Sequence, residues 1–174
     1  MIQDYAHDRN NTVRYTLGKY ITKPLIFFGI NPSTASIEKN DATISIIEHI
    51  AKLRHYDGYM MLNIYPLRAT RIDSTFPEKC DVDICEKNLH YIEKTIYKGA
   101  EVVAAWGNHI CDRDYFTDIL DRINRLVKEK GATWLCLSVT KGGHPHHPTR
   151  LAYNKMSFDI FDMDTYIQNM RNTK

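Results

Sequence analysis

The sequence has no long hydrophobic run. Its longest apolar stretches are far shorter than the roughly 20 residues that a membrane-spanning helix needs. Its first residues, Met-Ile-Gln-Asp, do not begin the apolar core of a secretory signal peptide. These two absences predict a cytoplasmic protein with no membrane partner.

A large charge of one sign is also missing. The chain has 23 Lys and Arg against 21 Asp and Glu, which gives a net charge of +2 with histidine neutral. No global electrostatic field therefore points to nucleic acid. A local basic patch is still compatible with this balance, because contact with phosphate needs only a few well-placed Lys and Arg side chains.

The cysteines include no Cys-x-x-Cys pair. In a reducing compartment such cysteines are typically free thiols and largely buried. A zinc or iron–sulfur site built from them is the less favoured alternative, and we expect no metal or other cofactor. The cysteines are Cys80, Cys85, Cys111 and Cys136.

Repeats, linkers and low-complexity segments are absent as well. A length of 174 residues is typical of one domain. We therefore expect residues 1–174 to form a single domain that begins with an arm and hairpin at residues 1–22. In that segment, polar residues 1–11 predict an irregular arm. The alternating residues 12–17 predict a strand that turns at Gly18 and Lys19.

Strand and helix patterns alternate along the rest of the chain. Apolar runs predict strands at 25–28, 59–65, 101–106 and 133–139. Helical spacing predicts helices at 41–54, 82–98 and 113–130, with a short closing helix at 164–170. Asp41 is expected to cap the first helix and Gly99 to end the second. The first helix is expected to bury Ile44, Ile47, Ile50, Ala51 and Leu53. This order predicts an α/β fold, a three-layer α/β/α sandwich around a four-stranded, largely parallel sheet.

Polar residues follow each predicted strand. In an open parallel sheet the carboxyl ends of the strands meet at one edge, where ligands bind. We therefore expect these residues to converge into a binding site, although loops are polar in any protein. The segments are Asn31-Pro32-Ser33, Asn63 with Arg68, Trp106-Gly107-Asn108 and the run from Lys141 through His144 to Pro148.

Gly29 ends the first of these strands, and Asn63 lies near the end of the second. A glycine lets a ligand approach the backbone closely. Asn63 interrupts an apolar run, and a buried amide without partners costs about 1–3 kcal/mol. One interpretation is that Asn63 bridges backbone groups. The other is that its donor and acceptor recognise a ligand, as on the edge of a pyrimidine or purine.

The histidine-rich run at 144–147 admits three interpretations. Its histidines are metal ligands, surface residues without a role, or groups that perform acid–base or electrostatic work on a substrate. The last is favoured, because the segment lacks carboxylate partners for a metal and its prolines stiffen the loop. Nearby side chains that could anchor phosphates are Arg68, Lys141 and Arg150.

Together these motifs resemble a bacterial and phage family known only as domain of unknown function 1643. The similarity covers most of the chain, and the family name states no activity. It rests on Gly29-Ile30-Asn31-Pro32-Ser33-Thr34-Ala35, Asp41-Ala42-Thr43, Asn63, Pro66-Leu67-Arg68-Ala69-Thr70, Trp106-Gly107 and Gly143-His144-Pro145-His146-His147-Pro148.

The order of the motifs is also similar, more distantly, to that of uracil-DNA glycosylases. These enzymes carry a Gly-x-Asp/Asn-Pro motif, a strand-terminal asparagine, a Trp-Gly strand and a His-Pro loop. The resemblance implies a uracil-DNA glycosylase-like fold, base flipping and hydrolysis of the N-glycosidic bond. It implies that Asn31 positions the attacking water, Asn63 holds the base edge and His147 stabilises the departing base. The other expected substrate-binding residues are Gly29, Pro32, Ser33, Asp41, Arg68, Lys141 and His144.

The chain departs from the glycosylase pattern at two points of the first motif. Ser33 stands where a tyrosine or glycine is typical, and Asn31 cannot act as a general base. Three functions therefore stay open: an N-glycosidase acting on a base in DNA or on a nucleotide, a non-catalytic module that binds a nucleotide or nucleic acid, and a hydrolase or transferase for a small non-nucleotide substrate. We expect a monomer in each case.

Overall fold

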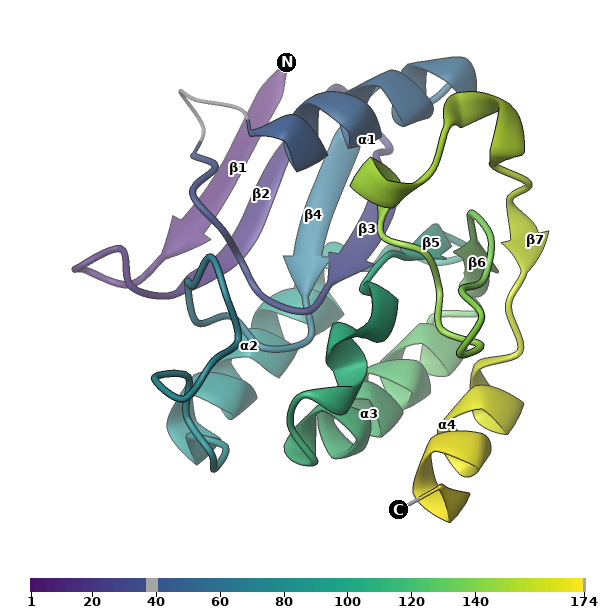
Figure 1. The fold of residues 1–174 in the computed structure, drawn as a ribbon. Coiled ribbons are helices and arrows are strands. Elements are labelled where there is room, and N and C mark those ends of the chain that lie inside the picture. Colours follow the sequence, from purple (N-terminus) through teal and green to yellow (C-terminus); the bar gives the residue numbers. More distant parts are fainter. Residues whose placement is uncertain (37–40, 174) are drawn as a thin grey trace.

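The computed structural model describes residues 1–36 and 41–173, which form a seven-stranded mixed sheet with helices on both faces (Figure 1). The strands lie in the order β1-β2-β4-β3-β5-β6-β7 across the sheet. Along the chain they are β1 (Ile2–His7), β2 (Arg14–Tyr20), β3 (Leu25–Gly29), β4 (Tyr59–Asn63), β5 (Glu101–Ala104), β6 (Thr133–Cys136) and β7 (Asp159–Ile160). The α-helices of the described residues are α1 (Ala42–Leu53), α2 (Val82–Thr95), α3 (Tyr115–Glu129) and α4 (Met163–Asn172).

The strands expected from the sequence are present and pair in parallel in the order β4-β3-β5-β6. The prediction of a four-stranded, largely parallel sheet is nevertheless wrong, because antiparallel strands extend it at both edges. β1 and β2 lie beyond β4, and β7 pairs with β6. The parallel strands are therefore all interior, which suits them because both of their faces are covered by helices.

The irregular arm expected at residues 1–11 is also wrong, because residues 2–7 form β1 and pair with β2. An edge strand needs no apolar run, so its sequence signal is weak. Gly18, where the sequence predicts a turn, lies instead inside β2. A Cβ at Gly18 would lie 2.7 Å from Met60 Cε and 2.9 Å from the Tyr59 carbonyl oxygen, so the glycine serves close strand packing.

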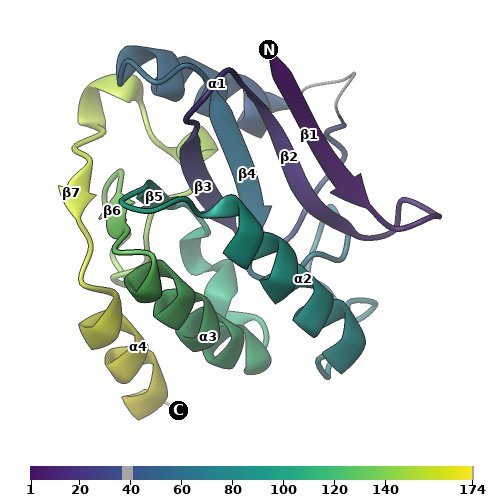
Figure 2. The same ribbon diagram turned by 180° about the vertical axis from the view of Figure 1, so that it is seen from behind.

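The sheet carries a separate apolar core on each face. α1 covers one face, and α2, α3 and α4 cover the other (Figure 1 and Figure 2). We call these the α1 face and the α2 face. Strand alternation builds both cores: Leu25 and Phe27 of β3 pack on the α1 face, whereas Ile26 and Phe28 pack on the α2 face.

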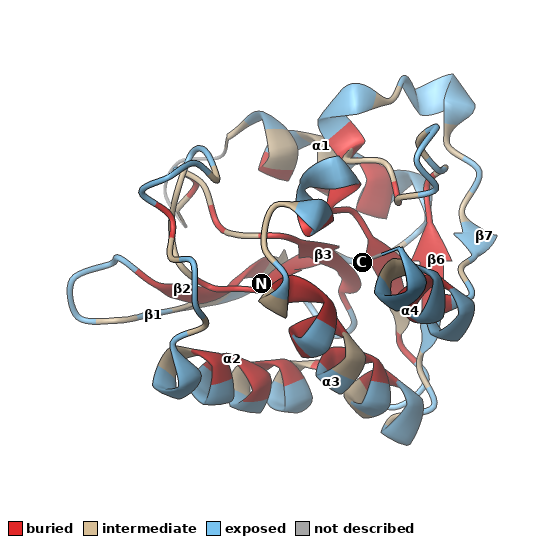
Figure 3. Cartoon of the chain, turned by 60° about the horizontal axis from the view of Figure 1, so that its bottom comes forward, coloured by how far each residue is buried: buried red, intermediate tan, exposed pale blue. Residues whose placement is uncertain are grey.

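The helices turn their buried residues toward the sheet (Figure 3). Asp41 caps α1 as expected by accepting the Ile44 N–H. The expected stripe of α1 is buried except for Leu53, which is 57% exposed. Its assignment to the stripe is wrong because, at 3.6 residues per turn, Leu53 lies on the opposite side of the helix from Ile44.

Several predicted elements, α2 and β6 among them, end earlier in the structure than in the sequence pattern. α2 ends at Thr95, its C-cap is Ile96, and Gly99 forms the turn that follows, with a φ of +73°. β6 ends at Cys136, because Val139 bridges back to Pro145 instead of continuing along β5. The loop after β6 is therefore held against its own strand.

Gly58, which joins α1 to β4, provides a test of the β2–β4 pairing. A Cβ there would lie 2.0 Å from Lys19 O and 2.4 Å from Tyr20 Cα, both in the backbone of β2. We expect Gly58→Ala to lower the free energy of unfolding by more than about 3 kcal/mol, because the two strands must move apart. Urea denaturation measures this loss.

Gly99→Ala is the matched control for that measurement. Nothing lies within 4 Å of a Cβ built at Gly99, so only left-handed backbone strain applies. That strain costs about 1–2 kcal/mol. Equal losses in the two variants would contradict the packing argument.

Candidate functional site

The carboxyl ends of β3 and β4 are joined beyond the last residues of the strands. Gly29 pairs with Asn63, and the Ile64 N–H donates to the Gly29 carbonyl at 2.9 Å. The Tyr65 N–H then donates to the Ile30 carbonyl at 2.8 Å. Parallel pairing therefore places the loop after β3 beside the loop after β4, on the edge where the sequence predicts a site.

Asn63 is fully buried, with 0% of its surface exposed. Among the residues that the structure describes, neither its Oδ1 nor its Nδ2 has a hydrogen-bond partner. Gly29 leaves room for this amide, since a Cβ there would lie 3.2 Å from Asn63 Oδ1. The amide thus lies on the α1 face over the β3 backbone, with a donor and an acceptor unused.

The backbone-bridging role that the sequence offered for Asn63 is filled by another residue. Asn88 of α2 donates from Nδ2 to the Asn63 carbonyl at 3.0 Å and to the Ile64 carbonyl at 3.2 Å. Sequence reasoning missed Asn88, although a polar residue between Cys85 and Ile92 in the buried stripe of α2 was a visible signal. Asn88 supports the end of β4 from the α2 face and leaves the Asn63 side chain unsupported on the α1 face.

Asn31 fastens the same two loops together. Its Nδ2 donates to the Ala69 carbonyl at 2.8 Å, the Pro32 carbonyl at 3.1 Å and the Leu67 carbonyl at 3.4 Å. The Ala69 N–H donates back to the Pro32 carbonyl at 2.9 Å. The nitrogen of the Asn31 amide is therefore occupied by backbone carbonyls, so only its oxygen is left to interact with a ligand.

Two arginines meet on the α1 face beside these loops. Arg14 is 2% exposed and donates from Nη1 to the Ala35 carbonyl at 2.9 Å. Arg68 donates to the same carbonyl at 3.1 Å and to the Ser33 carbonyl at 2.6 Å. Burial, and then the charge of Arg68, lowers the pKa of Arg14 to about 10, so Arg14 is still a cation at neutral pH. Sequence reasoning missed Arg14, whose signal was a charged side chain inside an alternating strand.

His147 lies in the loop after β6, beside Gly107. A Cβ at Gly107 would lie 3.6 Å from His147 Cβ, and Pro148–Arg150 after it form a short 3-10 helix that packs on α1. Burial, and then the charge of Arg150, lowers the pKa of His147 to about 4. The Thr149 N–H donates to Nδ1 at 3.4 Å. Nδ1 also lies 2.8 Å from Thr149 Oγ1. The imidazole is thus neutral at pH 7, and in the tautomer whose Nδ1 accepts from Thr149, its Nε2–H is a hydrogen-bond donor.

His144 lies on the α2 face, on the opposite side of the sheet from Asn63. Its Nδ1 lies 2.9 Å from Tyr166 Oη, which accepts a hydrogen bond from Trp106 at 3.2 Å in the core of the α2 face. Its Nε2 lies 3.5 Å from Cys111 Sγ. Burial lowers the pKa of His144. His144 and His147 therefore do not act together.

The remaining sequence candidates have mixed positions. Asp41 caps α1, and its charge acts on both Arg14 and His147, so it lies near both. Ser33 and Pro32 lie in the loop that Asn31 and Arg68 hold. Lys141 lies exposed in the turn between β6 and His144, and no described contact joins it to Asn63.

No group of three or more His, Cys, Asp or Glu side chains in residues 1–36 and 41–173 is arranged to hold a metal ion. No helix in the same part of the chain is long and apolar enough to cross a membrane. Cys85 and Cys136 are buried as expected, whereas Cys111 is exposed, so its expected burial is wrong.

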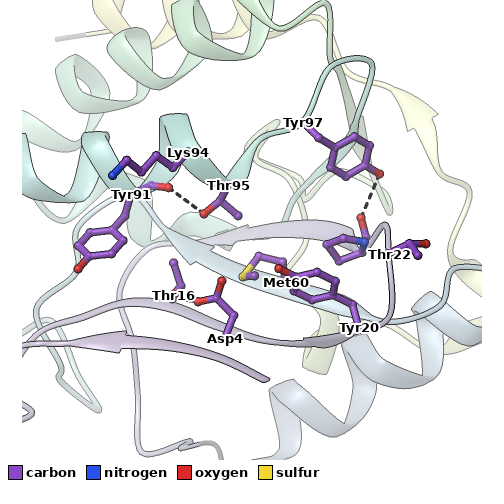
Figure 4. A pocket seen from close by; sticks show the side chains of 10 residues that line it. Asp4, Thr16, Tyr20, Thr22, Met60, Tyr91, Lys94, Thr95 and Tyr97 are labelled. Carbon is purple, nitrogen blue, oxygen red and sulfur yellow. Dashed lines mark hydrogen bonds between the residues drawn. The ribbon is translucent and has the colours of Figure 1, made fainter. Parts of the chain in front are cut away.

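A hollow of the described structure lies elsewhere, between the β1–β2 hairpin and α2 (Figure 4). Its volume is about 390 Å³, and Asp4, Tyr20 and Lys94 are among its lining residues. It opens on the α2 face, whereas Asn63 and Arg14 lie on the α1 face. Asn63 and Arg14 are instead buried, whereas Asn31, Arg68 and His147 are partly exposed.

A family model described as "protein of unknown function (DUF1643)" matches residues 14–149. The chain belongs to the DUF1643 family. No curated protein matches the chain, and no solved structure matches it. The resemblance to uracil-DNA glycosylases therefore stays a prediction. Arg14, Asn31, Asn63 and His147 all lie within the DUF1643 segment.

Replacing Asn63 tests whether this DUF1643 residue serves stability. We expect Asn63→Leu to raise the free energy of unfolding by about 1 kcal/mol, because it removes a buried amide with no partners and keeps its approximate shape. Asn88→Leu is the matched control: it should lower the same quantity by about 1–3 kcal/mol, since two backbone carbonyls lose their donor. Denaturation curves of both variants measure these changes in the free energy of unfolding. A loss of stability in Asn63→Leu would show that the amide is structural.

The depressed pKa of His147 predicts how stability depends on pH. The unfolded chain takes up a proton at this residue near its ordinary pKa of about 6.5, whereas the folded chain does so near pH 4. His147 therefore contributes stability above about pH 6.5, and the contribution is lost as the pH falls toward 4. An NMR titration of the ring should show no protonation down to about pH 5. His147→Gln should lose less stability than the native chain between pH 7 and 5, and a ring that titrates at its ordinary pKa would refute this.

Proposed function

We propose that this protein binds a nucleobase at the carboxyl ends of β3 and β4 and hydrolyses the N-glycosidic bond of that base. The observation that carries the proposal is the amide of Asn63, which is fully buried and has both polar atoms without partners among the described residues. Native proteins leave few such groups, because each costs about 1–3 kcal/mol. A penalty kept at this edge is expected if a ligand supplies the missing partners.

An amide is suited to a nucleobase because its donor and acceptor lie in one plane. It can pair with an N–H and a C=O on the edge of a pyrimidine or a purine. Gly29 lets this amide lie close to the β3 backbone, since Met61 Cε and Asn63 Oδ1 lie 2.6 Å and 3.2 Å from where a Cβ would be. The order of the motifs, similar to that of uracil-DNA glycosylases, supports the same ligand.

His147 supplies the group that hydrolysis requires at the departing base. When the C1′–N bond breaks, the base leaves with the bonding electron pair while a water oxygen bonds to C1′. The neutral imidazole can donate Nε2–H to the oxygen on which negative charge develops. The proton released by the water ends on the base or in solvent. The Asn31 oxygen can hold the water by accepting a hydrogen bond from it, since the Asn31 nitrogen is occupied.

A non-catalytic module that binds the same ligand is the second candidate. The observation that favours it is that Asn31 cannot take a proton from water. The nearby carboxylate that could take this proton, Asp41, whose charge acts on the pKa of His147, is already engaged in capping α1. A binding module and a glycosidase would share the Asn63 contact and differ only in turnover.

A base-release assay separates the two candidates. Oligonucleotides with uracil, mismatched thymine or hypoxanthine, and the corresponding nucleosides and nucleoside monophosphates, are incubated with the protein and the free base is measured. We expect release by the native chain, a drop of about 10²–10⁴ in His147→Ala, and loss of release in Asn63→Leu although that variant is folded.

Arg125→Gln is the control, because Arg125 is exposed on α3 and bonded to Asp121. It should release base at the native rate. Binding without release would favour the module. Neither binding nor release of any nucleobase compound by folded protein would sink the proposal.

A further inference from the structure

We propose that Arg14 and Arg68 bind the terminal phosphate of the ligand, so that the substrate class is a nucleoside monophosphate rather than a base within a DNA chain. The base contact in this statement rests on the proposed function above. The phosphate contact rests on separate observations, which concern how Arg14 reaches the α1 face and what it meets there.

An irregularity in β2 aims Arg14 at the α1 face. The β1–β2 register shifts between Ala6 and His7: Ala6 pairs with Thr16, whereas His7 pairs with Arg14, so Tyr15 is an extra residue. Such a bulge reverses the alternation of side chains between the residues on its two sides, here Thr16 and Arg14. Regular alternation would put Arg14 on the same face as Thr16, which lines the hollow beside α2. Instead, Tyr15 stacks on Tyr91 of α2 and Arg14 reaches Ala35 on the α1 face.

Arg14 is buried there without a carboxylate partner in the described part of the chain. No ion pair joins Arg14 or Arg68 to an acidic side chain among residues 1–36 and 41–173. The Nε of Arg14 has no hydrogen-bond partner there either. Asp41 lies near enough to favour the charge of Arg14 but uses its carboxylate to cap α1. A buried cation is costly unless an anion compensates it.

The hydroxyl of Tyr59 adds a second unused group near the same place. It is fully buried and has no partner among the described residues. Burial, and then the charge of Glu48, raises its pKa to about 12, and the charges of Arg14 and Asp41 act on it as well, so these groups are neighbours. A neutral hydroxyl and a guanidinium are both donors that a phosphate oxygen accepts.

The phosphate position is close to the base position. Asn63 and Tyr59 are both on β4, and with Met61 between them they share the α1 face. The Arg14 N–H donates to the Pro66 carbonyl at 2.9 Å, so Arg14 lies beside the end of β4 that carries Asn63. One small ligand can therefore meet the amide and the arginines together.

The burial of Arg14 decides between a nucleotide and a DNA chain. Its side chain is 2% exposed, so only a group that enters the fold can reach it. A terminal phosphate has three free oxygens and one attachment, and it can enter in this way. A backbone phosphodiester is attached on both sides and would have to bring two sugars with it. Arg68, half-buried and held by the Ser33 carbonyl, completes the pair at the outer side.

Calorimetry with four probes tests the proposal: inorganic phosphate, a nucleoside, its 5′-monophosphate and a short single-stranded oligonucleotide. We expect the native chain to bind phosphate, and to bind the monophosphate more tightly than the nucleoside or the oligonucleotide. Arg14→Gln should weaken phosphate and monophosphate binding by about tenfold to a hundredfold, as expected for a lost charge-assisted hydrogen bond. Arg125→Gln removes the same charge from α3 and should leave all four affinities within about twofold.

Arg68→Gln is the second variant, in case Arg14→Gln does not fold, and it should weaken the same two probes. The proposal is overturned if the native chain does not bind phosphate, or if nucleoside and monophosphate bind equally well. Tighter binding of the oligonucleotide would also overturn it. If the chain binds phosphate but not the nucleoside, the arginine site is supported and the base contact is refuted. If it binds the nucleoside, and the monophosphate no more tightly, the base contact is supported and the arginine site is refuted.

Discussion

Parallel pairing of β3 with β4 is the interaction on which the candidate site depends. It aligns Gly29 with Asn63 and continues through the Ile64 and Tyr65 N–H groups into the two loops beyond the strands. Asn31 then fastens those loops through backbone carbonyls. Without this pairing, Asn63 and Arg68 would have no fixed relation to the Asn31 loop, since they are far apart in sequence from it.

In the described part of the chain, both faces of the sheet bury polar groups without hydrogen-bond partners, and the α1 face has more of them. On the α2 face, Asn88 supports the carbonyls at the end of β4, and Trp106, Tyr166 and His144 form a connected chain. On the α1 face, the Asn63 amide, the Tyr59 hydroxyl and Arg14 Nε have no partners among the described residues. On the α2 face, Asn88 Oδ1 and Thr117 Oγ1 have no partner among these residues either. Buried polar groups are usually satisfied, so the two faces differ in how many such groups they hold, and the larger set on the α1 face is the one to which we assign a ligand by proposal.

The two apolar cores explain how the fold tolerates unpaired polar groups at the candidate site. The parallel strands are interior and carry apolar side chains into two cores, one on each face. Those cores supply the stability that the unpaired groups at the strand ends reduce. The expected gain in stability of Asn63→Leu and the loss in Asn88→Leu state this difference in measurable form.

The sequence by itself determined the interior strands, the helices and the Asp41 cap of α1, because apolar periodicity and capping residues act over a few positions. It also located Asn31, Asn63 and His147, because polar residues that follow buried runs are visible locally. Tertiary structure alone decided that β1 is a strand, that Arg14 turns to the α1 face and that His144 leaves the site. An edge strand takes its order from its partner, a bulge exists only in the register between two strands, and the side of the sheet that a loop residue reaches depends on what packs there.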